Sequence, residues 1–230
     1  MEIRILADAD GVAAEAARRI AAEARAAVAA RGRFVMAVSG GRTPWQMLRA
    51  LADEDVPWAG VHVVQVDERI SPAGDADRNL THLRESLVGR APLPADHIYA
   101  MPVEAADLDE AAGSYACLLE EIAGTPPVLD LAHLGLGPDG HTASLVPGDP
   151  VLDVADRDVA LTGIYMKRRR MTLTYPMINR SRRILWVVTG AGKAAMVSRL
   201  CAADASIPAG RVRQDRALVL ADRSAVGEQA

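Results

Sequence analysis

Short apolar runs alternate along the chain with longer segments that mix apolar, small and charged residues. An apolar run of about four to eight residues is typical of a strand buried on both faces, and a longer mixed segment is typical of a helix. Strands are expected at residues 2–6, 34–38, 61–66, 97–101, 131–136, 158–163, 170–174, 184–189 and 217–220. Helices are expected at residues 10–31, 44–53, 79–88, 107–123 and 192–203, with a loop at 145–157 and a turn at 176–182.

This alternation predicts an α/β protein with a mostly parallel sheet and helices on both of its faces. The expected architecture is therefore a three-layer α/β/α fold with a Rossmann-like sheet. No segment has the composition of an interdomain linker, and no internal repeat is present. Residues 1–230 are accordingly predicted to form a single domain, which is within the usual size range.

The composition and the charge argue against several classes of binding partner. The formal net charge is −4 and the longest basic run is Lys167–Arg170, so nucleic-acid binding is not expected. Aromatic residues make up 3% of the chain, too few for a platform on which bases stack. The two cysteines show no metal-site or disulfide pattern, and no apolar run reaches the ~18 residues of a membrane span. The early charges of Glu2, Arg4 and Asp8 are unlike a signal peptide, so a cytoplasmic protein is expected.

The segment Gly135–His141 follows a predicted strand and carries three glycines, then Asp139 and His141. Glycines allow a tight turn and a close approach to a ligand, and ligands bind beyond the carboxyl ends of parallel strands. The glycine spacing also fits the dinucleotide fingerprint. However, the next predicted strand, 158–163, does not end in the acid that would hold a ribose, so neither a nicotinamide nor a flavin cofactor is expected.

A second glycine turn lies between the strand at 34–38 and the helix that follows it. Thr43, Pro44 and Gln46 predict a capping box at the start of this helix. Backbone N–H groups at a helix start favour an anion, and phosphate is the natural candidate. The alternative is a Gly-Gly pair that only makes a tight connection. The candidate phosphate residues in this turn are Ser39, Gly40, Gly41, Arg42 and Thr43.

Four further charged residues lie at the end or the start of predicted elements. Asp67 and Arg69 lie in a turn at the end of the third strand, Arg170 begins a later strand, and Lys193 lies near the start of a helix. The simpler interpretation is a solvated charged loop for Asp67 and Arg69, and a surface charge for Lys193. Because the carboxyl ends of parallel strands meet at one edge, we expect these charges to converge there with the glycine turns.

The remaining histidines, cysteines and serines show few patterns of a catalytic or metal site. His133 lies inside a predicted strand and is expected to be a packed core side chain. The histidines and cysteines lack metal-ligand spacing, so no metal is predicted. There is no G-x-S-x-G motif for a serine nucleophile. An imidazole beside a carboxylate, with no nucleophile, favours general-base activation of water by His141.

Together these segments resemble the glucosamine-6-phosphate isomerase/6-phosphogluconolactonase family. The matching motifs are Ser39–Pro44, Asp67–Arg69 followed by Asn79, Gly135–Ser144, Arg170–Thr174 and Thr189–Lys193. The resemblance implies the fold of the isomerase. It also implies hydrolysis of 6-phospho-D-glucono-1,5-lactone to 6-phosphogluconate, a step of the oxidative pentose phosphate pathway, without a cofactor.

The resemblance also suggests roles for the candidate residues. His141 is expected to be the base, and either Asp139 or Asp67 orients it or holds sugar hydroxyls. Arg69 and glycine N–H groups are candidates for stabilising the oxyanion. The turn at 39–43, with Arg170 and Lys193, is expected to bind the 6-phosphate.

Two other functions remain open at this point. In the isomerase/deaminase branch a glutamate follows the histidine and an aromatic residue stands at the position of Arg69, whereas this chain has Val146 in the glutamate's place. Both departures favour the lactonase. A non-catalytic sugar-phosphate sensor would be expected to carry a DNA-binding helix-turn-helix, which is not evident. The sequence leaves open the oligomeric state and whether the loop 163–170 closes on a substrate.

Overall fold

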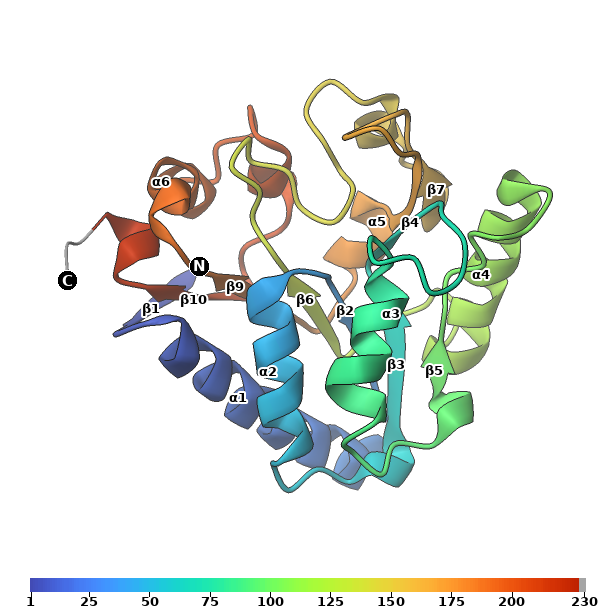
Figure 1. Ribbon diagram of the computed structural model, residues 1–230, viewed down its shortest axis with the longest axis horizontal. Coiled ribbons are helices and arrows are strands. Elements are labelled where there is room, and N and C mark those ends of the chain that lie inside the picture. The colour runs from blue at the N-terminus through green and yellow to red at the C-terminus, as the bar shows by residue number, and fades with distance from the viewer. Residues whose placement is uncertain (228–230) are drawn as a thin grey trace.

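A parallel seven-stranded sheet forms the centre of the protein (Figure 1). The computed structural model describes residues 1–227. The strands, in spatial order, are β1 (Glu2–Leu6), β10 (Ala217–Asp222), β9 (Arg183–Val188), β6 (Leu131–Leu134), β2 (Phe34–Val38), β3 (Val61–Gln65) and β5 (Ile98–Tyr99). All neighbouring pairs in this sheet are parallel, which confirms the predicted α/β class.

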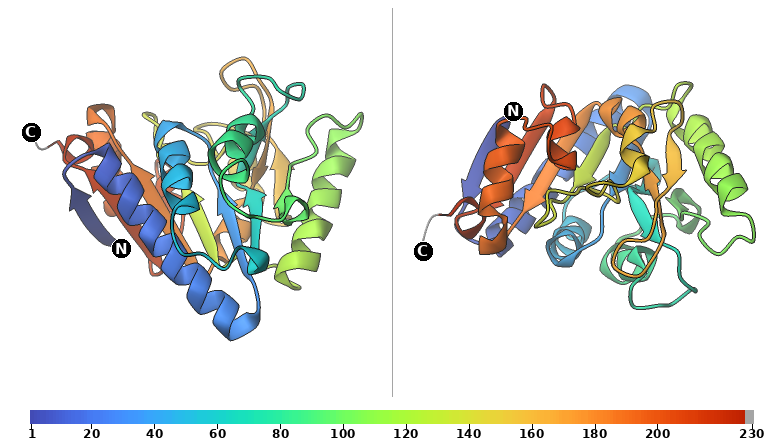
Figure 2. Two further views of the ribbon diagram at one scale, coloured as in Figure 1. Left: turned by 60° about the horizontal axis from the view of Figure 1, so that its bottom comes forward. Right: turned by 90° about the horizontal axis from the view of Figure 1, so that it is seen from above.

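Helices cover both faces of this sheet and make three layers (Figure 2). One face packs against α1 (Ala9–Arg31), α2 (Arg42–Ala52) and α3 (Asn79–Leu83), which continues as a π-helical turn at Arg84–Val88. The other face packs against α4 (Leu108–Ala123), α5 (Tyr175–Asn179) and α6 (Ala194–Cys201). Short 3₁₀ turns occur at Trp58–Gly60, Ala95–His97, Pro150–Asp153, Ala191–Lys193, Pro208–Arg211 and Ser224–Val226.

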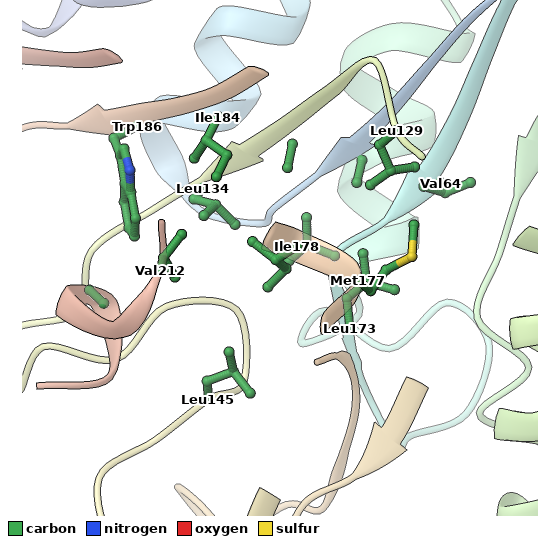
Figure 3. Close-up of a cluster of buried hydrophobic side chains, with 14 of the residues drawn as sticks. Val64, Leu129, Leu134, Leu145, Leu173, Met177, Ile178, Ile184, Trp186 and Val212 are labelled. Atoms are coloured by element: carbon green, nitrogen blue, oxygen red, sulfur yellow. The ribbon is translucent and has the colours of Figure 1, made fainter. Parts of the chain in front are cut away.

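The continuous apolar runs follow from burial on both faces. In β2, Phe34, Met36 and Val38 belong to the core on the α1 side, while Val35 and Ala37 belong to the core on the α4 side. Trp186, Ile178 and Met177 lie in this second core, which Figure 3 shows. A strand with two buried faces cannot alternate apolar and polar residues, which is why the sequence pattern identified these strands.

A second, three-stranded sheet joins β4 (Asp67–Arg69), β8 (Arg170–Leu173) and β7 (Val159–Leu161), all antiparallel. The sequence predicted β7 and β8 as strands, but interpreted residues 67–69 as a turn. The chain changes sheets at Val66, whose N–H donates to Val38 O (3.0 Å) and whose carbonyl accepts from Leu173 N (2.8 Å). This pairing joins segments about a hundred residues apart, so local pattern could not reveal it.

The predicted turn at 176–182 is also wrong. Residues Tyr175–Asn179 form α5, in which Pro176 occupies the first turn, where its missing N–H costs nothing, and Met177 and Ile178 are buried. The helix expected at 192–203 begins instead as a 3₁₀ turn before α6. Within residues 1–227, no helix combines the length and apolar character needed to cross a bilayer.

Candidate active site

A cavity of about 250 Å³ opens beyond the carboxyl ends of β2, β6 and β9, with β4 and β8 on its side. This volume lies just below the roughly 300–1,000 Å³ typical of drug-sized ligands, so the cavity suits a smaller molecule. The predicted site residues that line it are Ser39, Gly40, Gly41, Arg42, Thr43, Asp67, Arg69, His141, Arg170 and Lys193. The remaining one, Asp139, contacts His141.

His141 is held by its neighbour Asp139. Its Nδ1 lies 2.6 Å from Asp139 Oδ1, and its backbone N–H donates to the same oxygen at 3.2 Å. Burial by itself would raise the pKa of Asp139, but hydrogen bonds and charge from His141, with a hydroxyl from Tyr165, hold it below its usual value. An ionised carboxylate only accepts, so Nδ1 carries the hydrogen and Nε2 remains able to accept a proton.

Gly137 makes room for this pair. A Cβ built on Gly137 would lie 2.1 Å from His141 Nδ1 and 2.7 Å from Asp139 Oδ1, far inside van der Waals contact. Glycine is therefore required here by the close approach of the imidazole, whereas at Gly140 the backbone itself requires it, with φ at 83°.

Asp67 does not orient His141. Its Oδ2 accepts from Ser144 Oγ at 2.6 Å, and its Oδ1 lies 3.4 Å from Asn79 Nδ2. The side chain is buried but lines the cavity. Of the two acids that the sequence left open, the structure therefore pairs Asp139 with the histidine and leaves Asp67 to face the ligand space.

Asn79 connects Arg69 to the glycine turn at residues 39–43. The Nη1 of Arg69 donates to Asn79 Oδ1 and to Asp77 O, each at 2.7 Å. The Cβ of a side chain at Gly40 would lie only 1.9 Å from that same Asn79 oxygen. Gly40 thus allows the turn to pack directly on the amide that fixes the guanidinium.

The helix after this turn does not have the predicted capping box. Its N-cap is Gly41, at φ 130°, and no side chain caps it within the described chain. The Thr43 hydroxyl bonds instead to Thr189 Oγ1 at 2.6 Å, and Gln46 donates to Asp10 at 3.1 Å. Because glycine adopts this backbone conformation, the helix begins earlier than predicted. The residues of its first turn line the cavity, and no side chain in the described chain caps their N–H groups.

Ser39 differs from its predicted role. Its hydroxyl donates to His133 O at 2.9 Å, and its N–H donates to His133 Nδ1 at 3.2 Å. Both donors are therefore used inside the protein, and Ser39 shapes the turn rather than offering a hydroxyl to an anion. Burial lowers the pKa of His133 to about 3, so this core histidine stays neutral and able to accept.

Four cations line the cavity: Arg42, Arg69, Arg170 and Lys193. Arg170 is 6% exposed, and within residues 1–227 its Nε has no hydrogen-bond partner. Burial lowers the pKa of Arg170, although the nearby Asp67 carboxylate acts to raise it. Burial also lowers the pKa of Lys193, and there the Asp139 carboxylate acts to raise it. Desolvated cations that outnumber the carboxylates of their cavity favour an anionic ligand.

Residues 7–220 match the family described as glucosamine-6-phosphate isomerases/6-phosphogluconolactonase. The chain belongs to this family.

Several members of the glucosamine-6-phosphate isomerase/6-phosphogluconolactonase family are similar over most of their length. The 6-phosphogluconolactonase of Mycobacterium tuberculosis is 36% identical, with 98% of this chain and 97% of that protein covered. The 6-phosphogluconolactonase of Synechocystis sp. is 38% identical, with 74% of this chain and 72% of that protein covered. The crystal structure of 6-phosphogluconolactonase from Thermotoga maritima superposes with a TM-score of 0.84 at 27% identity, covering 96% of this chain and 98% of that one.

Sequence reasoning missed Tyr165, which the structure places on the predicted catalytic pair. Its hydroxyl donates to Asp139 Oδ2 at 3.0 Å and lies 3.4 Å from His141 Nδ1. Only the loop 163–170 had been marked, as a segment that could approach a substrate. Within residues 1–227, no three His, Cys, Asp or Glu side chains form a group that could hold a metal ion.

Proposed function

We propose that this member of the family is a 6-phosphogluconolactonase, which hydrolyses 6-phospho-D-glucono-1,5-lactone to 6-phosphogluconate. The observation that carries the proposal is the His141–Asp139 pair, at 2.6 Å, facing a cavity that also contains four cations. Relatives similar over nearly the whole chain are named 6-phosphogluconolactonases. A general base beside a cationic cavity is suited to a substrate that has an uncharged carbonyl group and, elsewhere in the same molecule, a negatively charged group.

In the proposed reaction, His141 Nε2 takes a proton from water as the oxygen attacks the lactone carbonyl carbon, C1. A neutral imidazole is a competent base near neutral pH. The carbonyl oxygen becomes an oxyanion, for which Arg69 and the N–H groups of the glycine turns are the candidate donors. When the intermediate collapses, the bond from C1 to the ring oxygen breaks, and the imidazolium returns its proton to that oxygen. Water is thereby added across one ester bond, and no cofactor is required.

The 6-phosphate is assigned to the cations of the cavity. Arg42, Arg170, Lys193 and the first N–H groups of α2 offer it positive charge and hydrogen-bond donors. Binding this remote group would fix the lactone carbonyl against His141, which converts binding energy into orientation. Because a phosphorylated sugar does not cross a bilayer unaided, we propose that the reaction takes place in the cytoplasm.

The isomerase/deaminase activity of the same family is disfavoured at Val146. The family resemblance puts a proton-transferring glutamate at this position, and a valine cannot carry a proton. Val146 is also buried, with 4% of its surface exposed. The chain therefore lacks at this position the acid that ring opening would use.

The decisive experiment is acid release, or proton NMR, with freshly prepared phosphogluconolactone and subtraction of its spontaneous opening. We expect catalysed turnover, and a loss of about 10²–10⁴-fold in His141→Ala, which removes the base. His82→Ala, whose ring lies on α3 outside the cavity, is the matched control and should retain native turnover.

Four outcomes would contradict the proposal. Near-native turnover in His141→Ala would reject the base. Equal hydrolysis of unphosphorylated gluconolactone by the native protein would reject the phosphate site. Ammonia release from glucosamine 6-phosphate, or lactone binding without turnover, would instead indicate the deaminase or a sugar-phosphate sensor.

A further inference from the structure

The loop between β7 and β8 brings one aromatic side chain onto the catalytic pair. Tyr165 N donates to Arg168 O at 2.9 Å, and Arg168 N donates to Tyr165 O at 3.2 Å, which closes a two-residue hairpin turn. The two turn residues, Met166 and Lys167, both have left-handed backbones, at φ 48° and 68°. This conformation is uncommon for side chains other than glycine and persists where surrounding contacts determine it.

Contacts on both sides of the hairpin hold the turn in this left-handed conformation. The Arg168 side chain reaches Asp75 at 3.1 Å and Asp77 at 2.9 Å, which anchors one side of the turn to the loop after β4. On the other side the Tyr165 hydroxyl reaches Asp139. Hydrogen bonds on both sides of the turn therefore fix the position of Tyr165.

Tyr165 makes two separable contacts inside the site. Its hydroxyl donates to Asp139 Oδ2 at 3.0 Å, so each oxygen of that carboxylate has one strong partner, His141 on Oδ1 and Tyr165 on Oδ2. The face of its ring lies 5.0 Å from the guanidinium carbon of Arg170. The ring also packs against His141 in a T-shaped arrangement, with 5.4 Å between the ring centroids.

We propose that Tyr165 is a positioning residue, whose hydroxyl fixes the Asp139 carboxylate that orients His141 and whose ring holds Arg170 in place. The proposal rests on the lactonase function proposed above. Burial and the neighbouring Asp139 both raise the pKa of Tyr165, so the phenol keeps its proton and acts as a donor. A carboxylate held at both oxygens cannot rotate away from the imidazole. A stacked guanidinium likewise presents its N–H edge in a fixed direction.

Two substitutions separate the hydroxyl from the ring. Tyr165→Phe keeps the ring and removes the donor to Asp139. We expect kcat to fall about three- to tenfold with KM within twofold of native. Asp139, relieved of one hydrogen bond, should stabilise the imidazolium more strongly, so the acidic limb of the pH profile of kcat/KM should move to higher pH by on the order of half a unit. Tyr165→Leu also removes the ring and should in addition raise KM about two- to fivefold.

The control is Ile164→Ala, whose side chain lies on the same hairpin and is 77% exposed. It should leave kcat, KM and the pH profile at native values. A merely structural role for the hairpin would lower activity in all three variants and would not move the acidic limb in Tyr165→Phe alone.

A measurement on the protein without substrate keeps this inference separate from the proposed function. NMR titration of the His141 ring nitrogens should show a higher midpoint in Tyr165→Phe than in the native protein and in Ile164→Ala. This result would support the contact even if the native protein failed to hydrolyse the lactone, in which case only the lactonase function would fail. An unchanged His141 titration together with a native pH profile in Tyr165→Phe would overturn the proposal.

Discussion

Substituting Gly137 by alanine tests whether the position of the imidazole controls turnover. The backbone of Gly137 lies outside the left-handed region, so an alanine can adopt it without strain. The new Cβ would nevertheless lie 2.1 Å from His141 Nδ1 and 2.3 Å from Cε1. Ordinary contact between such atoms is about 3.5 Å, so the ring must shift by roughly 1.4 Å or leave Asp139. A displacement of about 1 Å at a reacting group can cost on the order of 10²-fold in rate.

We therefore expect kcat for phosphogluconolactone to fall about 10²-fold in Gly137→Ala, with a much smaller change in KM. The three atoms nearest to the new methyl group belong to His141 and Asp139, and none belongs to Arg42, Arg170 or Lys193, to which phosphate binding is assigned. The assay is steady-state acid release corrected for spontaneous opening, with a thermal melt to show that the variant is folded.

The matched control is Gly113→Ala, on the exposed side of α4, where a Cβ meets nothing within 4 Å. It should keep native kinetics and, as alanine favours a helix interior, gain up to about 1 kcal/mol of stability. A folded Gly137→Ala variant with kcat within twofold of native would refute the argument, because it would show that His141 can move without loss of function.

Two further predictions concern the glycine turn at residues 39–43 and His133, which contacts it. Gly40→Ala places a Cβ 1.9 Å from Asn79 Oδ1, the acceptor of Arg69, so steady-state kinetics should show kcat/KM at least tenfold lower; a native value would mean that this contact is not needed. The pKa of His133 is about 3 in the folded protein against 6.5 for the ordinary group, so the unfolded chain takes up a proton that the folded protein does not. The free energy of unfolding is therefore intact above pH 6.5 and decreases as the pH falls toward 3, by up to about 1.4 kcal/mol per unit. Urea unfolding from pH 7 to 4 should show a shallower dependence in His133→Asn than in the native protein, and equal slopes would count against the neutral, buried histidine.

The sequence by itself determined the parallel sheet and the edge at which the candidate site residues gather. Apolar runs located the central strands, because side chains buried on both faces must be apolar in both directions. The glycine turns after residues 38 and 134 identified the functional edge, since the carboxyl ends of parallel strands lie together. Local pattern was therefore sufficient to gather the candidate residues around one cavity.

Only the tertiary structure decided the pairing within that cavity. Whether Asp67 or Asp139 holds His141 depends on the departure of β4 from the central sheet, a long-range pairing that no local pattern encodes. The use of both Ser39 donors by His133, and the arrival of Tyr165 on a hairpin, likewise depend on contacts between segments far apart in the chain. Residue type limits what a side chain can donate or accept, but its partner is fixed by distances and directions that arise only when the whole sheet has assembled.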